Sequence, residues 1–281
     1  MEKEIISAER SDFRDIAESN SYFVDKTMFI KELIDSKRYV TLITRPRRFG
    51  KSFNLSMLRY FFSPKEKDRN KKLFENLEIG KDHKFMEDYQ GKIPVIYLTM
   101  KECSSNCYEN FLSELRLMMQ DFLDSYPEIK DEAVSKPVTR QRYEAILNGS
   151  ASEAALAKSL ADIMKIMERN YDHKVAVLID EYDAPVFNIV SDESNNRMKI
   201  LNFMSRFYGN AMKDNPCLAF ALITGVHRIA KENLFSGFNN LSVSNVQNGV
   251  FSSYFGFTFN DVKNCYRFQF GKFLRKYEGM V

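Results

Sequence analysis

A glycine, a lysine and a serine stand together at Gly50-Lys51-Ser52. Residues 45–52 match the phosphate-binding pattern G-x-x-x-x-G-K-[ST], except that Arg45 replaces the first glycine. Gly50 would let the backbone wrap closely around phosphate oxygens, and successive backbone N–H groups would supply partial positive charge. Lys51 would reach the β- and γ-phosphates, and the Ser52 hydroxyl would be a ligand of Mg²⁺. These residues predict a phosphate loop, although a lone G-K-S also fits a surface turn.

Two adjacent carboxylates, Asp180 and Glu181, follow the apolar run of residues 175–179. Ligands of a parallel sheet collect at the carboxyl ends of its strands. We expect Asp180 to hold Mg²⁺, directly or through water, and Glu181 to polarise an attacking water as general base. Alone, the pair would equally fit a strand end with solvated acids. Next to a phosphate loop, it predicts phosphate chemistry.

Polar residues also follow a second apolar run, residues 217–223. Thr224 could sense the γ-phosphate or orient the attacking water. Arg228 could stabilise charge in the transition state, but we favour an ordinary surface arginine. His227 has no partner nearby in sequence and receives no role. For Asp183 we favour a helix cap over a hydrogen-bond acceptor beside the site.

The elements that must position these residues can be read from hydrophobic periodicity. Short apolar, β-rich runs predict buried strands at residues 39–44, 93–98, 175–179 and 217–223. Helical spacing predicts helices at residues 53–62, 108–127, 140–170 and 195–213. Residues 1–38 are predicted to be helical, with starts near Asp12 and Asp25, and residues 63–92 to hold loops and short helices. Alternating strands and helices predict a three-layer α/β fold, with a mostly parallel sheet and helices on both faces.

Composition limits the class of protein. The 281 residues are 44% hydrophobic and include 24 Phe, which indicates a folded globular chain. A net charge of +3 means that any nucleic-acid role would need a local basic patch. The four cysteines lack the partners of a zinc site, so we expect free thiols in a reducing compartment. There is neither a secretory h-region nor an apolar run of about 20 residues, which predicts a soluble, cytoplasmic protein.

Six segments together resemble the bacterial AAA-ATPase-like family, within the P-loop NTPases that carry an additional catalytic glutamate. They are Tyr22-Phe23-Val24-Asp25-Lys26-Thr27, Thr44-Arg45-Pro46-Arg47-Arg48-Phe49-Gly50-Lys51-Ser52, Asp180-Glu181-Tyr182-Asp183-Ala184-Pro185, Ile223-Thr224-Gly225-Val226, Leu234-Phe235-Ser236-Gly237-Phe238-Asn239-Asn240 and Phe255-Gly256-Phe257-Thr258. They occur in the family's order and extend from about residue 12 to residue 262.

The resemblance implies more than the residues alone do. An arginine at position 45 is usual in this family, so it no longer counts against nucleotide binding. The strand near residue 96 should lie on the outer side of the strand that ends at Asp180. The Asp180 strand should not lie directly beside the strand that precedes the phosphate loop. The family's segment at residues 24–27 should approach the nucleotide. The implied cofactors are ATP and Mg²⁺; ATP is preferred to GTP on resemblance, because no N-K-x-D motif is found. The expected binding set is Asp25, Lys26, Arg45, Pro46, Arg47, Arg48, Phe49, Gly50, Lys51, Ser52 and Phe53, with Ser52 and Asp180 on the metal and Lys51, Glu181, Thr224 and Arg228 as catalytic residues.

The domain prediction places an ATPase core with an N-terminal helical segment at residues 1–262. Family members often continue into a PD-(D/E)XK nuclease-like domain, and nothing in this sequence matches it. Residues 263–281 depart from the family and are basic and aromatic. They fit a truncated lid, a nucleic-acid contact with stacking aromatics, or a helix that packs on the core, which we favour.

The residues and the resemblance together predict an ATPase that works as a conformational switch or motor for a partner. A nucleotide-binding interaction module with little turnover, associated with nucleic acid, is the alternative. A phosphotransferase is less favoured, because no convincing lid is found. A nucleic-acid or protein partner, the oligomeric state and a neighbouring subunit's arginine stay open.

Overall fold

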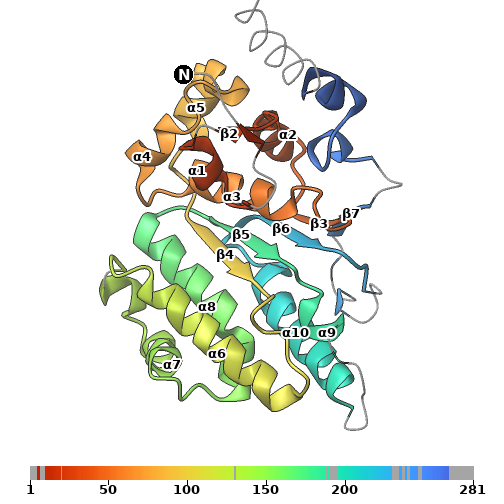
Figure 1. The fold of residues 1–281 in the computed structure, drawn as a ribbon. Helices are drawn as coiled ribbons and strands as arrows, with labels where there is room; N and C mark the ends of the chain where they lie inside the picture. The colour runs from red at the N-terminus through yellow and green to blue at the C-terminus, as the bar shows by residue number, and fades with distance from the viewer. Residues whose placement is uncertain are drawn as a thin grey trace, which may run out of the picture.

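Five strands in parallel pairs form the sheet that carries the predicted site (Figure 1). The computed structural model describes residues 5–6, 10–19, 21–129, 131–187, 189, 195–229, 234–235, 238, 241–245 and 249–265. The strands are β3 (Val40–Thr44), β4 (Val95–Thr99), β5 (Val175–Asp180), β6 (Leu218–Gly225) and β7 (Leu241–Ser244). Every residue of β3 and β5 is buried, which explains why both are continuous apolar runs in the sequence.

The strand order is β4-β5-β6-β3-β7. Thus β4 lies outside β5, and β6 separates β5 from β3, which confirms both expectations about strand order. In the register, Thr44 of β3 pairs with Gly225 of β6, and Thr99 of β4 pairs with Asp180 of β5. The carboxyl ends of β3, β5 and β6 therefore meet at one edge of the sheet, where the acidic pair can approach the loop across β6.

Helices cover both faces of the sheet, as predicted (Figure 1). On the upper face in that view lie α1 (Phe13–Ala17), α2 (Met28–Asp35), α3 (Lys51–Phe62), α4 (Lys67–Lys72) and α5 (His83–Tyr89). On the lower face lie α6 (Tyr108–Asp124), α7 (Pro137–Leu147), α8 (Glu153–Tyr171), α9 (Ala184–Phe187) and α10 (Asn196–Met212). The short 3₁₀ helices are η1 (Glu78–Lys81), η2 (Asp131–Val134) and η3 (Ser252–Tyr254). Two large apolar clusters, one on each face, complete three layers.

The prediction of one helix over residues 140–170 is wrong, because the chain breaks between α7 and α8. Gly149 has φ +72°, a left-handed conformation that glycine adopts at little cost. The Asn148 side chain accepts a hydrogen bond from Ser150 N at 3.0 Å, which stabilises the turn. The Ser152 hydroxyl then caps α8 by accepting from Ala155 N. Asn-Gly-Ser is a turn signal, but the helical spacing of the apolar residues around it led to the prediction of one continuous helix.

The first 38 residues are not wholly helical. The short strands β1 (Ile5–Ile6) and β2 (Ser21–Tyr22) pair in parallel, which the sequence did not predict. The predicted helix starts are confirmed: the Asp12 side chain caps α1, and α2 follows Thr27. The short helices predicted within residues 63–92 are α4, η1 and α5.

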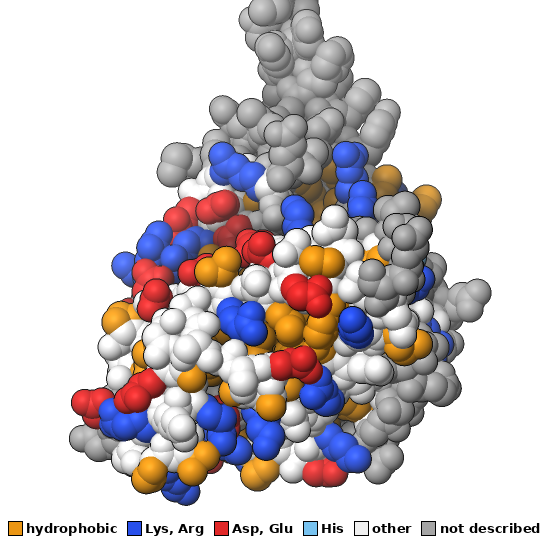
Figure 2. All heavy atoms as spheres, turned by 90° about the horizontal axis from the view of Figure 1, so that it is seen from below, with side chains coloured by type: hydrophobic (Ala, Val, Ile, Leu, Met, Phe, Trp, Pro, Cys, Tyr) orange, Lys and Arg blue, Asp and Glu red, His pale blue; other side chains and the backbone are white. Residues whose placement is uncertain are grey.

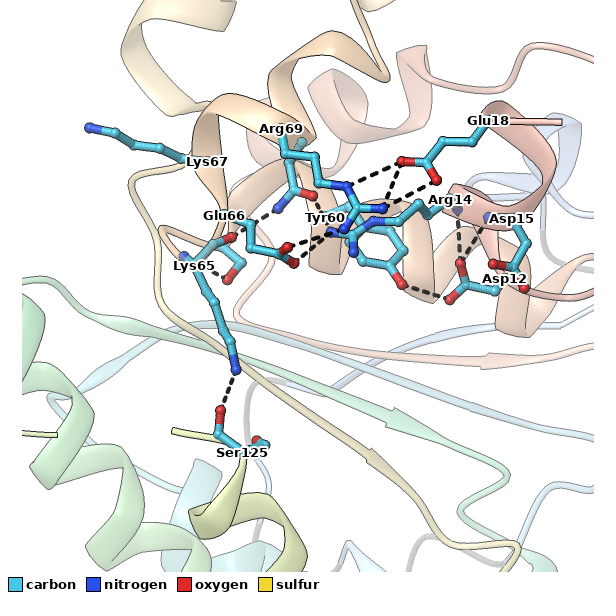
Figure 3. A network of polar contacts seen from close by, with 12 residues as sticks. Asp12, Arg14, Asp15, Glu18, Tyr60, Lys65, Glu66, Lys67, Arg69 and Ser125 are labelled. Carbon is cyan, nitrogen blue, oxygen red and sulfur yellow. Dashed lines mark hydrogen bonds and ion pairs between the residues drawn. The ribbon is translucent and has the colours of Figure 1, made fainter. Parts of the chain in front are cut away.

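A network of ion pairs fastens α1 against α3 and α4 (Figure 3). Arg14 lies 3.0 Å from Glu66 and donates to Asn70 at 2.6 Å, and Arg69 lies 3.1 Å from Glu18. Tyr60 of α3 donates to the capping Asp12 at 3.0 Å. Each exposed ion pair contributes little to stability. The packing of the buried Phe13 therefore holds α1 more strongly than the ion pairs do. The network braces the helix that follows the phosphate loop.

The C-terminal residues bear on the domain prediction only in part. Residues 259–265 form one helix across the predicted boundary at residue 262, and the rest of the predicted tail lies outside the described residues. The four cysteines are free thiols, as predicted. In the part of the chain that the structure describes, no helix has the length and apolar character needed to cross a membrane.

Candidate phosphate site

The segment after β3 turns directly into α3, so the strand–loop–helix prediction is confirmed. Arg48 and Gly50 have φ values of +68° and +74°. A Cβ on Gly50 would meet no atom within 4 Å, so glycine serves the backbone conformation there rather than a close approach. The 12-residue α3 begins at Lys51, and its N-terminal N–H groups and dipole lie at the end of the loop.

Lys51 lies over the backbone of its own loop. Its Nζ donates 2.9 Å hydrogen bonds to the carbonyl oxygens of Arg45 and Pro46, and the residue is 8% exposed. Burial lowers the pKa of Lys51, and the carboxylates at the end of β5 oppose that shift. The ammonium is thus largely removed from water, so its attraction for an anion is strengthened.

Asp180 joins three elements of the site. Its Oδ2 accepts a 2.5 Å hydrogen bond from Ser52 Oγ at the start of α3. Its Oδ1 accepts from Thr224 Oγ1 at 2.5 Å and from Glu181 N at 3.0 Å. The carboxylate is 3% exposed. Two residues proposed from separate parts of the sequence, Ser52 and Thr224, therefore meet at the buried carboxylate of Asp180.

Glu181 has an unusual backbone conformation. Its φ is +49°, which costs about 1 kcal/mol or more for a residue with a Cβ. Tyr182 N donates to Thr224 O at 3.0 Å, and Ala184 N donates to Glu181 O at 3.0 Å. These bonds hold the residue on its C-terminal side. Its half-buried carboxylate makes no hydrogen bond to the described residues, which leaves it able to accept a proton.

Asp183 does not cap α9 with its side chain, so the favoured interpretation is wrong. Among the N–H groups of the helix, that of Ala184 donates to the Glu181 carbonyl, and those of Val186 and Phe187 donate to the Asp183 carbonyl. The carboxylate accepts from Val226 N at 3.2 Å and from His227 N at 2.7 Å. The Asp183 carboxylate is therefore a hydrogen-bond acceptor beside the site, which is the alternative that we favoured less.

His227, for which we expected no role, has two partners. Its Nδ1 lies 3.1 Å from Asp183 Oδ2, and its ring stacks on Phe187 with centroids 4.1 Å apart. The sequence separation of 44 residues hid the contact with Asp183. Arg228, the next residue, is exposed and makes no hydrogen bond or ion pair to the described residues.

The Arg45 side chain points away from Lys51. Its guanidinium donates to Thr44 O and Ser244 O at 3.0 Å, and to Ser244 Oγ at 3.1 Å. It also lies 5.8 Å from the Phe255 ring centroid. The residue is 2% exposed, and burial lowers the pKa of the guanidinium. Arg45 therefore contributes its backbone to the loop and its side chain to the attachment of β7.

The other predicted loop residues divide into two groups. Pro46, Arg47 and Arg48 are exposed. Phe49 O accepts from Gly256 N at 3.0 Å, and a Cβ on Gly256 would lie 2.9 Å from the Phe49 ring. Phe49 is therefore covered by the C-terminal segment of the described chain.

The predicted contacts outside the loop lie against other elements. The Phe53 ring packs against Phe13, with centroids 5.5 Å apart. Asp25 accepts from Thr27 N and Glu78 N, both at 2.8 Å. The Phe13–Phe53 contact connects the N-terminal segment to α3, and the bond from Glu78 N to Asp25 connects it to η1.

Lys26 joins the N-terminal segment to the C-terminal residues that cover Phe49. Its Nζ donates to Ser253 O at 2.7 Å and lies 2.5 Å from Asp261 Oδ2. The described hydrogen bonds of Asp25 and Lys26 thus go to segments that flank the loop, and none goes to residues 45–52.

The donor set fits a magnesium ion. Mg²⁺ takes one or two protein oxygen ligands and completes its shell with phosphate oxygens and water. The Ser52 hydroxyl and the Asp180 carboxylate are such ligands, and they already lie together. Among the described residues, no cluster of three or more His, Cys, Asp or Glu side chains is placed so that it could hold a metal ion by itself.

Comparison with known proteins identifies the family of the chain. Residues 9–235 match the family model described as Predicted AAA-ATPase, a range that includes the loop, the acidic pair and Thr224. The chain is also 26% identical over 241 residues to an "Uncharacterized protein in vnfD 5'region" of Azotobacter chroococcum mcd 1. That alignment covers 86% of this chain and 40% of the relative, so the chain spans about two fifths of the relative's length. The family match covers well over half of the chain, and the protein belongs to the AAA-ATPase-like family.

Proposed function

We infer that this protein binds ATP with Mg²⁺ and hydrolyses it, as a conformational switch or motor for a partner. The observation that carries the proposal is the convergence of Ser52 and Thr224 on the two oxygens of Asp180. It places the loop helix, the acidic strand end and a polar strand tip around one position. The next residue along the chain is Glu181, whose carboxylate makes no hydrogen bond to the described residues.

Binding would use groups that already point at the loop. The N–H groups of residues 46–52 and the dipole of α3 favour phosphate oxygens. Lys51 would exchange its two backbone carbonyl partners for phosphate oxygens, which carry more negative charge. Exposed Arg47 and Arg48 would add positive charge at the loop's outer side. Mg²⁺, held by Ser52 and Asp180, would neutralise phosphate charge when bound.

Hydrolysis would use Glu181 and Thr224. The Glu181 carboxylate would accept a proton from the attacking water, whose oxygen forms the new bond to the γ-phosphorus as the bond to the ADP oxygen breaks. Thr224 would hold Asp180 or the water in place. Arg228 is exposed. Its side chain would have to turn toward the phosphates to add positive charge there.

The charge distribution on one face bears on the kind of partner. Over the described face seen from below, Lys and Arg side chains are interspersed with Asp and Glu (Figure 2). A nucleic-acid backbone is typically followed by a stripe of one sign. The partner remains a prediction for experiment, and DNA or RNA is the alternative.

Phosphate release from MgATP tests the proposal. We expect slow release by the wild type, with undiminished ATP binding but no turnover in Glu181→Gln, and lost binding in Lys51→Ala. Glu144→Gln, at an exposed acid of α7, is a control that should match the wild type. Equal turnover by wild type and Glu181→Gln would reject the role of Glu181. Binding without turnover in the wild type would favour an interaction module, and stimulation by DNA or RNA would identify a nucleic-acid partner.

A further inference from the structure

The residues after Glu181 are bonded to the turn that follows β6. The Asp183 carboxylate is 4% exposed and accepts two backbone N–H groups, from Val226 and His227. Both donors come directly after Thr224-Gly225, the tip of β6. Asp183 therefore holds the backbone that follows the predicted catalytic threonine.

Tyr182 makes the same connection from the other side. Its hydroxyl donates to His227 O at 2.9 Å and accepts from Ile229 N at 3.0 Å. Its own N–H donates to Thr224 O at 3.0 Å. Burial raises the pKa of Tyr182 to about 12, so the hydroxyl keeps its proton and can donate and accept at neutral pH. We call these bonds of Tyr182 and Asp183 to residues 224–229 the β5–β6 link.

A glycine permits the two segments to meet. A Cβ at Gly225 would lie 2.5 Å from Asp183 Oδ1 and 2.6 Å from the Tyr182 ring. No side chain fits there without moving one of the two residues. The link is thus a direct contact of both segments, and it fixes their separation.

The link lies where it can control Glu181. On one side of Glu181, its N–H is held by Asp180 Oδ1 at 3.0 Å. On the other side are Tyr182 and Asp183. Glu181 itself, between these two attachments, has φ +49°. A strained conformation persists only where surrounding bonds determine it, and here these bonds are those of the link.

We propose that Asp183, together with Tyr182, is a positioning residue that holds the Glu181 carboxylate and the Thr224 hydroxyl in a fixed relative position. This rests on the proposed hydrolysis. Neither residue needs to touch the nucleotide. Loss of the link would let the tip of β6 and the strained residue relax independently, and the reacting water would lose its alignment.

The test is steady-state ATP hydrolysis with separate measurement of MgATP binding and of Tm. In Asp183→Asn, an amide NH₂ takes the place of Oδ1, 3.3 Å from Val226 N, or of Oδ2, 2.7 Å from His227 N, and the remaining oxygen is uncharged, so the bonds to the two backbone N–H groups weaken. In Tyr182→Phe, the ring is kept and the hydroxyl is lost. We expect kcat to fall about 10–100-fold in both variants, with an unchanged dissociation constant for MgATP. The control is Tyr126→Phe, which also removes a buried tyrosine hydroxyl, bonded to Val95 O at 2.9 Å at the start of β4, and which should keep near wild-type kcat.

The outcomes separate two failures. Absence of turnover in the wild type would reject the proposed hydrolysis, and the positioning role with it. Normal wild-type turnover with unchanged kcat in Tyr182→Phe would reject the positioning role alone. Parallel losses of affinity, kcat and Tm would also reject it, because they would indicate a purely structural role. If Asp183→Asn does not fold, the isosteric Tyr182→Phe decides.

Discussion

The hydroxyl of Thr224 donates a 2.5 Å hydrogen bond to Oδ1 of Asp180. The two residues end neighbouring strands, and Asp180 also accepts a hydrogen bond from Ser52 through its other oxygen. One carboxylate thus has both oxygens oriented by hydroxyl groups from different elements. Rotation of this carboxylate would break one of the two bonds, so its orientation is set before any ligand arrives.

Thr224→Val should reduce ATP turnover while MgATP binding is largely kept. Valine has the same shape, but it leaves Asp180 Oδ1 with only the Glu181 N–H and removes the hydroxyl from the site. We expect kcat to fall by about 10–100-fold, as for other residues that orient a metal ligand. Phosphate release and nucleotide titration measure the two quantities. Undiminished turnover would show that the hydroxyl only fills space.

Thr41→Val, on neighbouring β3, should instead stabilise the protein. The Thr41 hydroxyl is buried and finds no hydrogen-bond partner among the described residues. Its removal would relieve a desolvation cost of about 1 kcal/mol, and valine suits a central strand. Urea unfolding would show the increase in the free energy of unfolding.

A matched control for that change is Thr27→Val. The Thr27 hydroxyl donates to Asp25 Oδ1 at 2.7 Å and accepts from Ile79 N at 3.1 Å. Its loss would leave the buried N–H of Ile79 without a bond, so stability should fall by about 1–3 kcal/mol. If both variants change stability in the same direction, hydrogen bonding of the hydroxyl does not decide the effect.

The residues of the candidate site were more predictable from the sequence than the elements and contacts that position them. Residues 45–52 and the pair Asp180-Glu181 could be found from the sequence because apolar strands precede them and the motif has fixed spacing. Strand order came only from the family resemblance, since every buried strand has a similar pattern. The short strand β7 was missed because two of its four residues are serines and most of it is only partly buried.

The role of Asp183 shows why some contacts leave no trace in a sequence. Its partners are backbone N–H groups at Val226 and His227, and every residue except proline carries such a group. No side-chain pattern marks which N–H will be used. The direction of the Arg45 side chain was hidden in the same way, because two of its acceptors are carbonyl oxygens.

The Lys26–Asp261 pair should make stability depend on pH. Burial raises the pKa of Asp261, but hydrogen bonds from Lys26 and from Thr258 N–H outweigh it and hold the pKa below its ordinary value. A depressed native pKa adds stability above the unfolded-state pKa, near 3.9, and this is lost as the pH falls through the native value. Asp261→Asn should therefore be less stable than the wild type at pH 7, and the difference should shrink below about pH 4.

Urea unfolding at several pH values between 7 and 3 measures this convergence. Asp121→Asn, at an exposed aspartate of α6, is the control, and it should follow the wild type throughout. A difference between wild type and Asp261→Asn that stays constant with pH would show that the ion pair contributes no pH-dependent stability.

Arg45→Gly would restore the first glycine of the general phosphate-loop pattern, yet we expect it to harm the protein. The guanidinium makes three hydrogen bonds, two of them to Ser244 of β7, and it is almost fully buried. Its removal would leave a cavity and detach the edge strand, at a cost of about 2 kcal/mol or more in the free energy of unfolding. Arg47→Gly is the matched control, because Arg47 is an exposed arginine of the same loop and its loss adds the same backbone freedom. Urea unfolding of the two variants separates tertiary attachment from loop entropy, and equal stability losses would contradict the anchoring role of Arg45.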